Sequence, residues 1–440
     1  MASNSPPPPV PAPAVAPPPG AATRREPVWT RRGTWAYRRI AGALFLSGYA
    51  TFSLLYCVQP LLPVLAREFG VSAAESSLAL SSTTVCLALA IVAASVVAER
   101  FGRKSLMFAS LCSVSVLCLI TATVHDWHLL VALRALQGIA LGGVPAVAIA
   151  YLAEEIEPAG LGTAMGLYVG GTAFGGMAGR IVTGFVTEHA DWRMALAAIG
   201  CLGLAAAVGF VALLPASRNF QRKRDTGFAY HVAIWRRHLG SPGLRLLFLT
   251  GFLVMGTFVT VYNYVGFLLT APPYGLGQGA VGLIFLVYTF GMIASPLAGN
   301  FADRIGRGPV SIVGVLVALV GVALTLIPAS LIAVIAGTAL VAIGFFVCHA
   351  VASSWIGILA DGDKSHAAAL YLLLYYVGSS VAGSLGGVFW ADAGWLGVVA
   401  FVAVLHLIEL AIAVRLAAME RARLARTGRG TPDDDIPAGA

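Results

Sequence analysis

Long apolar runs separated by short polar or charged segments form the pattern of this chain from residue 39 to residue 418. Each run has about 18 residues or more, enough to cross a hydrocarbon layer roughly 30 Å thick. The runs lack the alternating polarity of a barrel strand, and a backbone facing lipid must satisfy its own hydrogen bonds, so we predict helices. The twelve predicted spans are residues 39–65, 75–98, 104–124, 128–153, 160–187, 193–215, 244–270, 278–302, 309–328, 330–360, 366–391 and 395–418.

Two short charged segments repeat one order of residues in the two halves of the chain. Residues 95–104 are SVVAERFGRK and residues 299–308 are GNFADRIGRG, so an acid, an arginine, one free position, a glycine and an arginine recur. Trp192 and Trp395 each open an apolar run at nearly the same separation. Because each charged segment falls between two predicted spans, the sequence indicates a duplicated unit of six helices.

Local composition divides the chain further. Nine prolines in the first twenty positions, without apolar periodicity, predict a disordered segment. The predicted parts are a disordered Pro-rich cytoplasmic tail at 1–36, an N-terminal six-helix bundle at 37–215, a basic cytoplasmic linker at 216–243, a C-terminal six-helix bundle at 244–418 and a cytoplasmic tail at 419–440.

Composition and charge identify the solvent that the chain faces. Hydrophobic residues make up 58% of the chain and charged residues 11%, against roughly 25% charged in soluble proteins. The 28 lysines and arginines fall on the side of the N-terminus, except Arg67, Arg134, Arg180 and Arg193. This distribution predicts that both termini are cytoplasmic. Topology thus explains the net charge of +8, and we expect no nucleic-acid partner.

Several kinds of chemistry have no motif in the sequence. The six cysteines all lie inside apolar runs without a C-x-x-C pair, so we expect neither disulfides nor a metal site. A phosphate loop of the G-x-x-x-x-G-K-[ST] type does not occur, which leaves ATP-driven transport unsupported. We expect no cofactor, and we do not expect an enzyme.

These features together resemble the major facilitator superfamily, in particular its bacterial twelve-span drug and arabinose-efflux branch with the YnfM-type inner-membrane transporters. The likeness covers residues 37–418 and rests on the two charged loops and on two helix motifs. The predicted fourth span holds R-x-x-Q-G-x-x-x-G from Arg134 to Gly142, and the fifth holds G-x-x-x-G-G-x-x-G from Gly171 to Gly179. The resemblance implies an all-α membrane fold of two pseudo-symmetric six-helix bundles.

The charged loops have two interpretations. In the family such loops act as a conformational latch, a contact that holds the cytoplasmic ends of the bundles together in one state, and an acid near a helix N-terminus is typically worth 0.3–1 kcal/mol. The alternative is a topology signal alone. The candidate latch residues are Glu99, Arg100, Gly102, Arg103, Asp303, Arg304, Gly306 and Arg307.

Glycines at every fourth position of the fifth span, Gly171, Gly175 and Gly179, leave one side of that helix without side chains. Another helix can approach closely there, so we predict helix packing, with a role in sealing the cavity as the alternative.

In this fold the first, fourth, seventh and tenth spans line a central cavity. Aromatic residues with polar groups suit amphipathic or drug-like ligands, although ordinary packing explains such residues equally well. The candidate substrate or coupling residues from these spans and the eleventh are Tyr49, Tyr56, Gln59, Gln137, Tyr262, Asn263, His349 and Tyr375.

Arg134 and Arg180 are the two arginines that lie well inside the first six spans, away from the span ends. A charge at the centre of a span costs about 2.5–3.5 kcal/mol even on the lenient insertion scale, so both need a reason. Helix geometry places both roughly 10 Å below the outer surface. Either they reach Glu68, Glu75, Glu188 and Asp191 near the outer ends and seal that side, or they bind an anionic group of a substrate.

Three further groups inside the second half are titratable. His406 and Glu409 are three residues apart and share a helix face, which favours a structural pair or a side chain reaching to the interface over a proton carrier. His349 is either a satisfied buried histidine or part of a proton relay.

We therefore expect a secondary transporter that moves a small solute by alternating access, with proton-coupled efflux of drug-like or sugar-like compounds as the first hypothesis. The alternative is uniport or exchange of an anionic metabolite. A membrane sensor or lipid-modifying enzyme is a remote third, because the sequence lacks a large soluble domain and a catalytic cluster. The expected partners are the substrate, protons and the lipid bilayer of a bacterial inner membrane, with the monomer as the working unit.

Overall fold

The computed structural model describes residues 28–219, 228–327, 329–360 and 363–426, without the side chains of residues 92, 94–101, 146, 228, 229, 424 and 426. Helices make up nearly all of this part. Those of the first half are α1 (Trp35–Tyr56), η1 (Gln59–Leu61), α2 (Leu62–Phe69), α3 (Ala73–Ser76), α4 (Leu78–Phe101), α5 (Arg103–Thr121), α6 (Trp127–Leu141), α7 (Pro145–Glu155), α8 (Pro158–His189) and α9 (Trp192–Leu213).

The second half is built in the same way. Its helices are α10 (Phe228–Gly240), α11 (Pro242–Thr270), α12 (Gln278–Leu283), η2 (Ile284–Val287), α13 (Tyr288–Ile305), α14 (Arg307–Leu324), α15 (Leu331–Leu359) and α16 (Lys364–Arg426).

The described helices account for the twelve predicted spans. Nine segments of the described part are long and apolar enough to cross a membrane. One of them, within α16, contains two spans, because Ala393 (φ −142°) and Gly394 (φ 57°) interrupt the helical conformation. The pair α6 and α7 and the 32-residue α8 supply the other two. The predicted all-helical architecture is confirmed.

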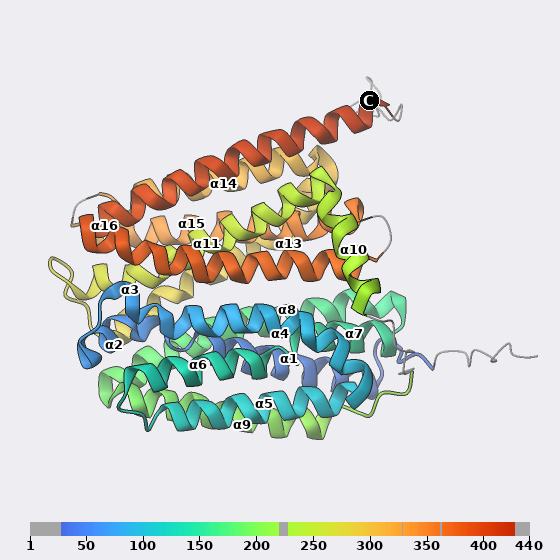
Figure 1. Cartoon of the computed structure of the whole chain (residues 1–440), viewed down its shortest axis with the longest axis horizontal. Coiled ribbons are helices and arrows are strands. Elements are labelled where there is room, and N and C mark those ends of the chain that lie inside the picture. Colours follow the sequence, from blue (N-terminus) through green and yellow to red (C-terminus); the bar gives the residue numbers. More distant parts are fainter. Residues whose placement is uncertain (1–27, 220–227, 328, 361–362, 427–440) are drawn as a thin grey trace, which may run out of the picture.

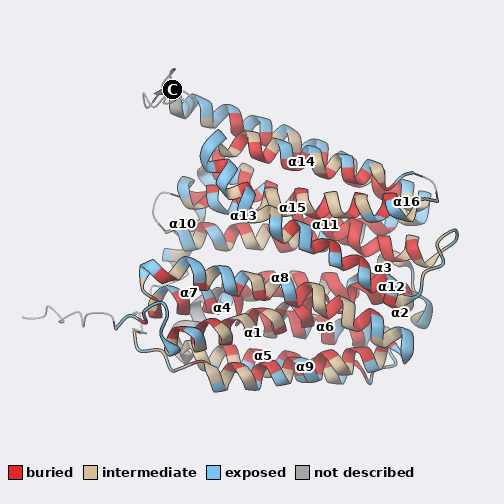
Figure 2. Ribbon diagram, turned by 180° about the vertical axis from the view of Figure 1, so that it is seen from behind, coloured by how far each residue is buried: buried red, intermediate tan, exposed pale blue. Residues whose placement is uncertain are grey.

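The helices of the two halves form two groups that lie one above the other in Figure 1. The start of α1, α10 and the last turns of α16 lie at one end of the molecule in Figure 1, which we name the terminal end. Helices α2 and α3 lie at the opposite end, which we name the distal end. Exposed positions recur along the outer helices (Figure 2). Large apolar side chains are among them, including Val208, Val320, Leu396 and Leu407. Such a surface suits contact with lipid tails.

The repeated loops adopt the same backbone conformation. Gly102 separates α4 from α5 with φ 77° and ψ 140°, and Gly306 separates α13 from α14 with φ 91° and ψ 155°. Only glycine adopts this region readily, because it has no Cβ. The glycine of the motif therefore ends one helix and reverses the chain into the next in both halves.

Glycines also bring α1 and α8 together. A Cβ added at Gly175 would lie 2.2 Å from the carbonyl oxygen of Tyr49, and one at Gly171 would lie 2.5 Å from that of Phe45. At Gly179 the closest atom is the Oγ of Ser53, at 2.6 Å. The backbones thus touch over three successive turns, which packs this face of α8 directly against α1.

Several boundaries differ from the predicted ones. Residues 1–27 lie outside the described part, but residues 28–34 are ordered, since Thr30 donates its N–H to the Glu155 carbonyl at 2.8 Å and accepts from the Glu157 N–H at 3.2 Å. The predicted linker contains helix α10, and α16 continues as far as Arg426 into the predicted tail. The predicted span 128–153 is broken into α6 and α7, because Pro145 cannot donate the hydrogen bond that would continue α6.

Candidate functional site

A cavity of about 560 Å³ lies between the two helix groups. This volume suits a drug-sized ligand. Its walls come from α1, α8, α11, α13, α15 and α16 and are mostly aromatic or thioether side chains, including Phe52, Tyr56, Met165, Met255, Phe258, Tyr288, Met292, Phe345, Phe346, Tyr375 and Tyr376. Along α8 the lining runs from Met165 to Arg180, so the cavity extends from the level of Arg180 toward the terminal end.

Arg180 is the one charged side chain among the described residues that line the cavity. Its Nε donates to Oε1 of Gln59 at 2.6 Å, and its Nη1 donates to the Gly176 carbonyl at 2.6 Å. The guanidinium carbon lies 4.3 Å from the centre of the Tyr56 ring and 5.1 Å from that of Tyr288. Within the described part, no carboxylate pairs with Arg180 and its Nη2 has no acceptor.

Two tyrosine hydroxyls beside Arg180 also lack partners. The Oη atoms of Tyr56 and Tyr288 are buried and have no hydrogen-bond partner among the described residues. Buried hydroxyls normally find one, and leaving one unpaired costs about 1–3 kcal/mol. The guanidinium and the two hydroxyls therefore form a set of donors around one point of the cavity wall.

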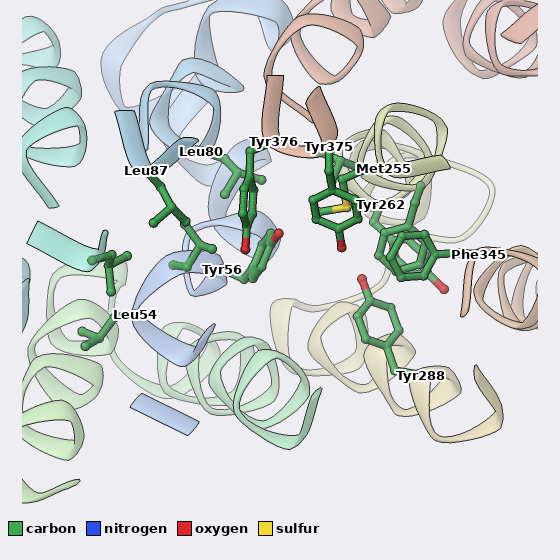
Figure 3. Close-up of a cluster of buried hydrophobic side chains, with 14 of the residues drawn as sticks. Leu54, Tyr56, Leu80, Leu87, Met255, Tyr262, Tyr288, Phe345, Tyr375 and Tyr376 are labelled. Atoms are coloured by element: carbon green, nitrogen blue, oxygen red, sulfur yellow. The ribbon is translucent and has the colours of Figure 1, made fainter. Parts of the chain in front are cut away.

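The part of the wall formed by α15 and α16 carries His349 and Tyr375. His349 Nδ1 and the Tyr371 hydroxyl are 2.8 Å apart, and the His349 and Tyr375 ring centres are 4.9 Å apart. In Figure 3 Tyr56 and Tyr376 stand on one side, and the hydroxyls of Tyr288 and Tyr375 point toward the same space. Aromatic rings from both halves thus enclose the ligand space.

Arg134 lies elsewhere, and its environment differs from that of Arg180. It is fully buried and donates from Nε to the Ala79 carbonyl at 2.7 Å, from Nη1 to Leu54 at 3.1 Å and from Nη2 to Leu55 at 2.7 Å. Gln137 accepts from Arg134 as well and donates to Thr121 Oγ1 at 2.8 Å. The carbonyls of Leu54 and Leu55 are free because α1 ends at Tyr56. Arg134 therefore fixes the end of α1.

The two arginines do not pair with the outer acids. Glu68 pairs with Arg193 at 2.9 Å, and Glu188 accepts the Gly279 N–H at 2.6 Å. Glu75 forms the capping box of α3 with Ser72, and Asp191 caps α9. The expectation that these acids hold Arg134 and Arg180 is therefore wrong.

The remaining cavity candidates fall into two groups. Gln59 and Asn263 lie behind the lining, where Gln59 Nε2 donates to Asn263 Oδ1 at 2.7 Å. Tyr262 and Tyr49 lie outside the lining: the Tyr262 hydroxyl donates to the Thr338 carbonyl at 2.9 Å, and the Tyr49 ring lies against Phe174.

Hydrogen bonds between the two halves gather at the distal end. Thr84 and Ser380 hydroxyls are 2.7 Å apart, Ser384 donates to Ser81 Oγ at 2.9 Å, and Ser77 donates to Ser384 at 3.2 Å. Gly184 and Gly282 also touch, since a Cβ at Gly184 would lie 2.9 Å from the Gly282 Cα. We name the hydroxyl cluster Ser77, Ser81, Thr84, Ser380 and Ser384 the distal seal. The cavity is closed on that side.

The charged loops lie at the terminal end. The side chains of Glu99 and Arg100 lie outside the described part, so the latch prediction for them stays a prediction. Arg103 pairs with Glu154, and its Nε donates to that carboxylate at 2.6 Å. Arg307 pairs with Asp303 at 3.1 Å. Arg304 is exposed in the same loop.

Sequence reasoning missed several lining residues. Tyr288, which lines the cavity directly after η2, and Phe285, which lies within η2, both contact Arg180, yet the span around them is uniformly apolar and carries no periodic signal. Phe345 lies four residues before His349, so the helical spacing around that histidine was the one available indication.

Comparison with known proteins identifies relatives along nearly the whole chain. A family model described as the Major Facilitator Superfamily matches residues 40–280. The inner membrane transport protein YnfM of Escherichia coli K12 is 46% identical over 388 residues, covering 88% of this chain and 92% of YnfM. The uncharacterized MFS-type transporter YybF of Bacillus subtilis 168 is 43% identical over 384 residues, covering 87% of this chain and 94% of YybF.

Solved structures share the fold. A bacterial homolog of the human lysosomal transporter Spinster superposes with a TM-score of 0.71 at 16% identity, over 88% of this chain and 98% of that one.

Proposed function

The chain belongs to the major facilitator superfamily and is a secondary transporter, and we propose that its solute is an amphipathic organic anion, carried by alternating access. The observation that carries this proposal is that the guanidinium of Arg180 has no carboxylate partner among the described residues. It lies in a cavity otherwise lined mainly by aromatic and thioether side chains. An arginine fork binds a carboxylate through two parallel hydrogen bonds.

Cavity polarity distinguishes between the solutes considered above. A sugar-like solute needs hydrogen-bond partners around its whole rim, whereas this lining is mainly aromatic and thioether and its one charged side chain among the described residues is Arg180. An aromatic or drug-like body bearing one anionic group matches both parts of the wall, the rings by stacking and the donors by charge. A neutral drug-like solute would leave Arg180 buried without a counter-charge, which is costly.

The proposed membrane and the orientation in it rest on the distribution of lysine and arginine and on the relatives. YnfM is named an inner membrane transport protein, and we propose the bacterial inner membrane for this chain as well. The excess of lysine and arginine at the terminal end supports cytoplasmic termini. With that orientation the cavity extends toward the cytoplasm and the distal seal closes the outer side. We propose export in exchange for protons as the mode of transport, with the monomer as its unit.

Thermal unfolding of the purified protein tests the solute class. We expect 1-naphthoate to raise the melting temperature in a concentration-dependent manner, because a ligand that binds only the folded state stabilises it. The neutral isostere 1-naphthamide should not do so. Arg180→Gln and Arg180→Lys should both lose the response to naphthoate, since lysine cannot reproduce the fork.

Arg193→Lys is the matched control, because Arg193 pairs with Glu68 at the distal end, away from the cavity lining. It should respond to naphthoate as the wild type does. Equal stabilisation by naphthamide, or a normal naphthoate response in both Arg180 variants, would overturn the anionic assignment.

A further inference from the structure

A second buried polar site lies within the C-terminal helices. His406 Nδ1 and Glu409 Oε2 are 3.0 Å apart on the second half of α16. Both side chains are buried, with 4% and 2% of their surface exposed. The sequence favours a structural pair or a side chain reaching to the interface, yet the pair points into the helix group, against α11, α14 and α15.

The surroundings of this pair are apolar. Val254 and Thr257 of α11 face it, as do Val315 and Ala318 of α14 and Gly344 of α15. The titratable groups near the pair are Cys348 of α15 and Tyr371 of the first half of α16; α11 and α14 present none among the described residues. No lysine or arginine of the described part lines the site.

In this apolar environment the charge of the Glu409 carboxylate must be neutralised by a proton on the pair. A carboxylate without a cation is expensive in an apolar interior, so Glu409 needs either its own proton or a protonated His406. The Nε2 of His406 is buried and has no partner in the described part. The pair therefore carries one proton in an enclosed site. The Nε2 of His406 is the donor or acceptor position that no described residue uses.

A connection to the cavity exists through neighbouring side chains. The Cys348 thiol lies beside Glu409, and the next residue, His349, lines the cavity. His349 Nδ1 is 2.8 Å from the Tyr371 hydroxyl. Phe258 and Phe345 line both the cavity and the small pocket around the pair, so the pair lies directly behind the cavity wall.

We propose that His406 and Glu409 form the proton-binding site that couples transport, a proposal that rests on the proposed function of the cavity. The proton passes between water in the cavity and the pair on the side of His349, and leaves by the same route. Release of the proton leaves the carboxylate without a cation in an apolar interior, and this raises the cost of keeping α16 packed against α14 and α15. The step transfers only a proton, and no covalent bond to carbon is made or broken.

Infrared difference spectroscopy of the purified protein, without solute, tests proton binding directly. We expect a C=O stretch of a protonated carboxyl group in the spectrum of the wild-type protein. Glu409→Gln should abolish this band. His406→Asn should shift its frequency, because the histidine is the hydrogen-bond partner of the carboxyl group. Glu155→Gln is the control: Glu155 is also buried, but three donors from residues 217–219 occupy it, and the band should persist.

Transport in proteoliposomes tests coupling. Movement of 1-naphthoate driven by a pH gradient should fall at least tenfold in Glu409→Gln, while naphthoate still stabilises the variant against heat. Gradient-driven transport at the wild-type rate in Glu409→Gln, or a band unchanged in that variant, would overturn the proposal. Should the variant fail to fold, Glu409→Asp, which keeps a titratable group and displaces it, must shift the band.

The two proposals fail separately. If naphthoate does not bind the wild-type protein, the anionic substrate assignment is wrong, and the infrared band still decides whether Glu409 binds a proton. If naphthoate binds and moves without dependence on Glu409, the substrate assignment stands and the proton site is wrong.

Discussion

Gln59 donates from its side-chain nitrogen to Oδ1 of Asn263 over 2.7 Å, and this bond joins the first half of the chain to the second. The oxygen of the same amide accepts from Arg180 at 2.6 Å. One side chain therefore links the proposed substrate ligand to the contact between the halves. A solute that draws Arg180 toward itself acts on this contact directly.

Loss of the Gln59 amide should favour the state that is open at the distal end. In Gln59→Leu, Asn263 loses its partner and the closed state loses a buried hydrogen bond, worth about 0.5–1.5 kcal/mol net. The measurement is disulfide yield between cysteines introduced by Ser77→Cys and Ser384→Cys, whose hydroxyl oxygens are 3.2 Å apart. The yield should fall relative to the cysteine pair alone.

A protease site inserted in the segment 220–227 makes the crosslink visible, since only crosslinked halves stay together on a denaturing gel. Thr123→Val, which removes an exposed hydroxyl bonded to its own helix, should leave the yield unchanged. An undiminished yield in Gln59→Leu would show that this amide does not hold the closed state.

Arg134 should matter for stability and not for solute binding. Arg134→Gln and Arg134→Lys both orphan buried carbonyls of Leu54, Leu55 or Ala79, each at a cost of about 1–3 kcal/mol. Both variants should melt at lower temperature, while 1-naphthoate still raises the melting temperature of the folded fraction. Loss of the naphthoate response with an unchanged melting temperature would place Arg134 in the solute site instead.

Gly175 should tolerate no side chain. In Gly175→Ala the added methyl meets the Tyr49 carbonyl at 2.2 Å, so α1 and α8 must separate, at a cost of about 1–3 kcal/mol. Gly170→Ala on the same helix is the control, because nothing lies within 4 Å of its Cβ. We expect a lower melting temperature for the first variant and an equal or higher one for the second. Equal melting of both would contradict the close packing.

The N-terminal tail should divide into a dispensable and a required part. Deletion of residues 2–23 should leave melting temperature and insertion unchanged, because its composition offers little apolar surface to bury. Deletion of residues 2–34 removes the bonds of Thr30 to residues 155 and 157 and the Arg32 N–H bond to Glu157. This longer deletion should lower the melting temperature. Equal melting temperatures of the two deletion variants would show that residues 28–34 do not contribute to stability.

Features with a local physical cause were predictable from the sequence. Apolar runs of membrane length predicted the spans, and the repeated motif predicted the position of two loops in which Gly102 and Gly306 adopt matching backbone angles. Pro145 after two glycines carried the signal for the break between α6 and α7. The amphipathic sequence of α10, in which apolar residues precede and follow Arg236 and Arg237, was the signal for a helix in the linker.

The different roles of Arg134 and Arg180 were not predictable. Both are lone arginines at similar depth, and the difference depends on where α1 ends. Carbonyls freed at Leu54 and Leu55 occupy Arg134, whereas Arg180 meets a glutamine and aromatic rings from α1, η2 and α13. Likewise, the spacing of His406 and Glu409 predicted their shared face, but not that this face points inward.

The distal seal is built from neutral hydroxyls, and this keeps its own share of the work of conformational exchange small. Each such bond contributes about 0.5–1.5 kcal/mol net, because water offers equivalent partners once the halves separate. Moving a two-state equilibrium from 1:99 to 99:1 takes about 5.5 kcal/mol of differential binding. A few hydroxyl pairs such as Thr84 with Ser380 and Ser81 with Ser384 lie within that range, so the binding energy of one small solute is enough to offset the loss of these pairs.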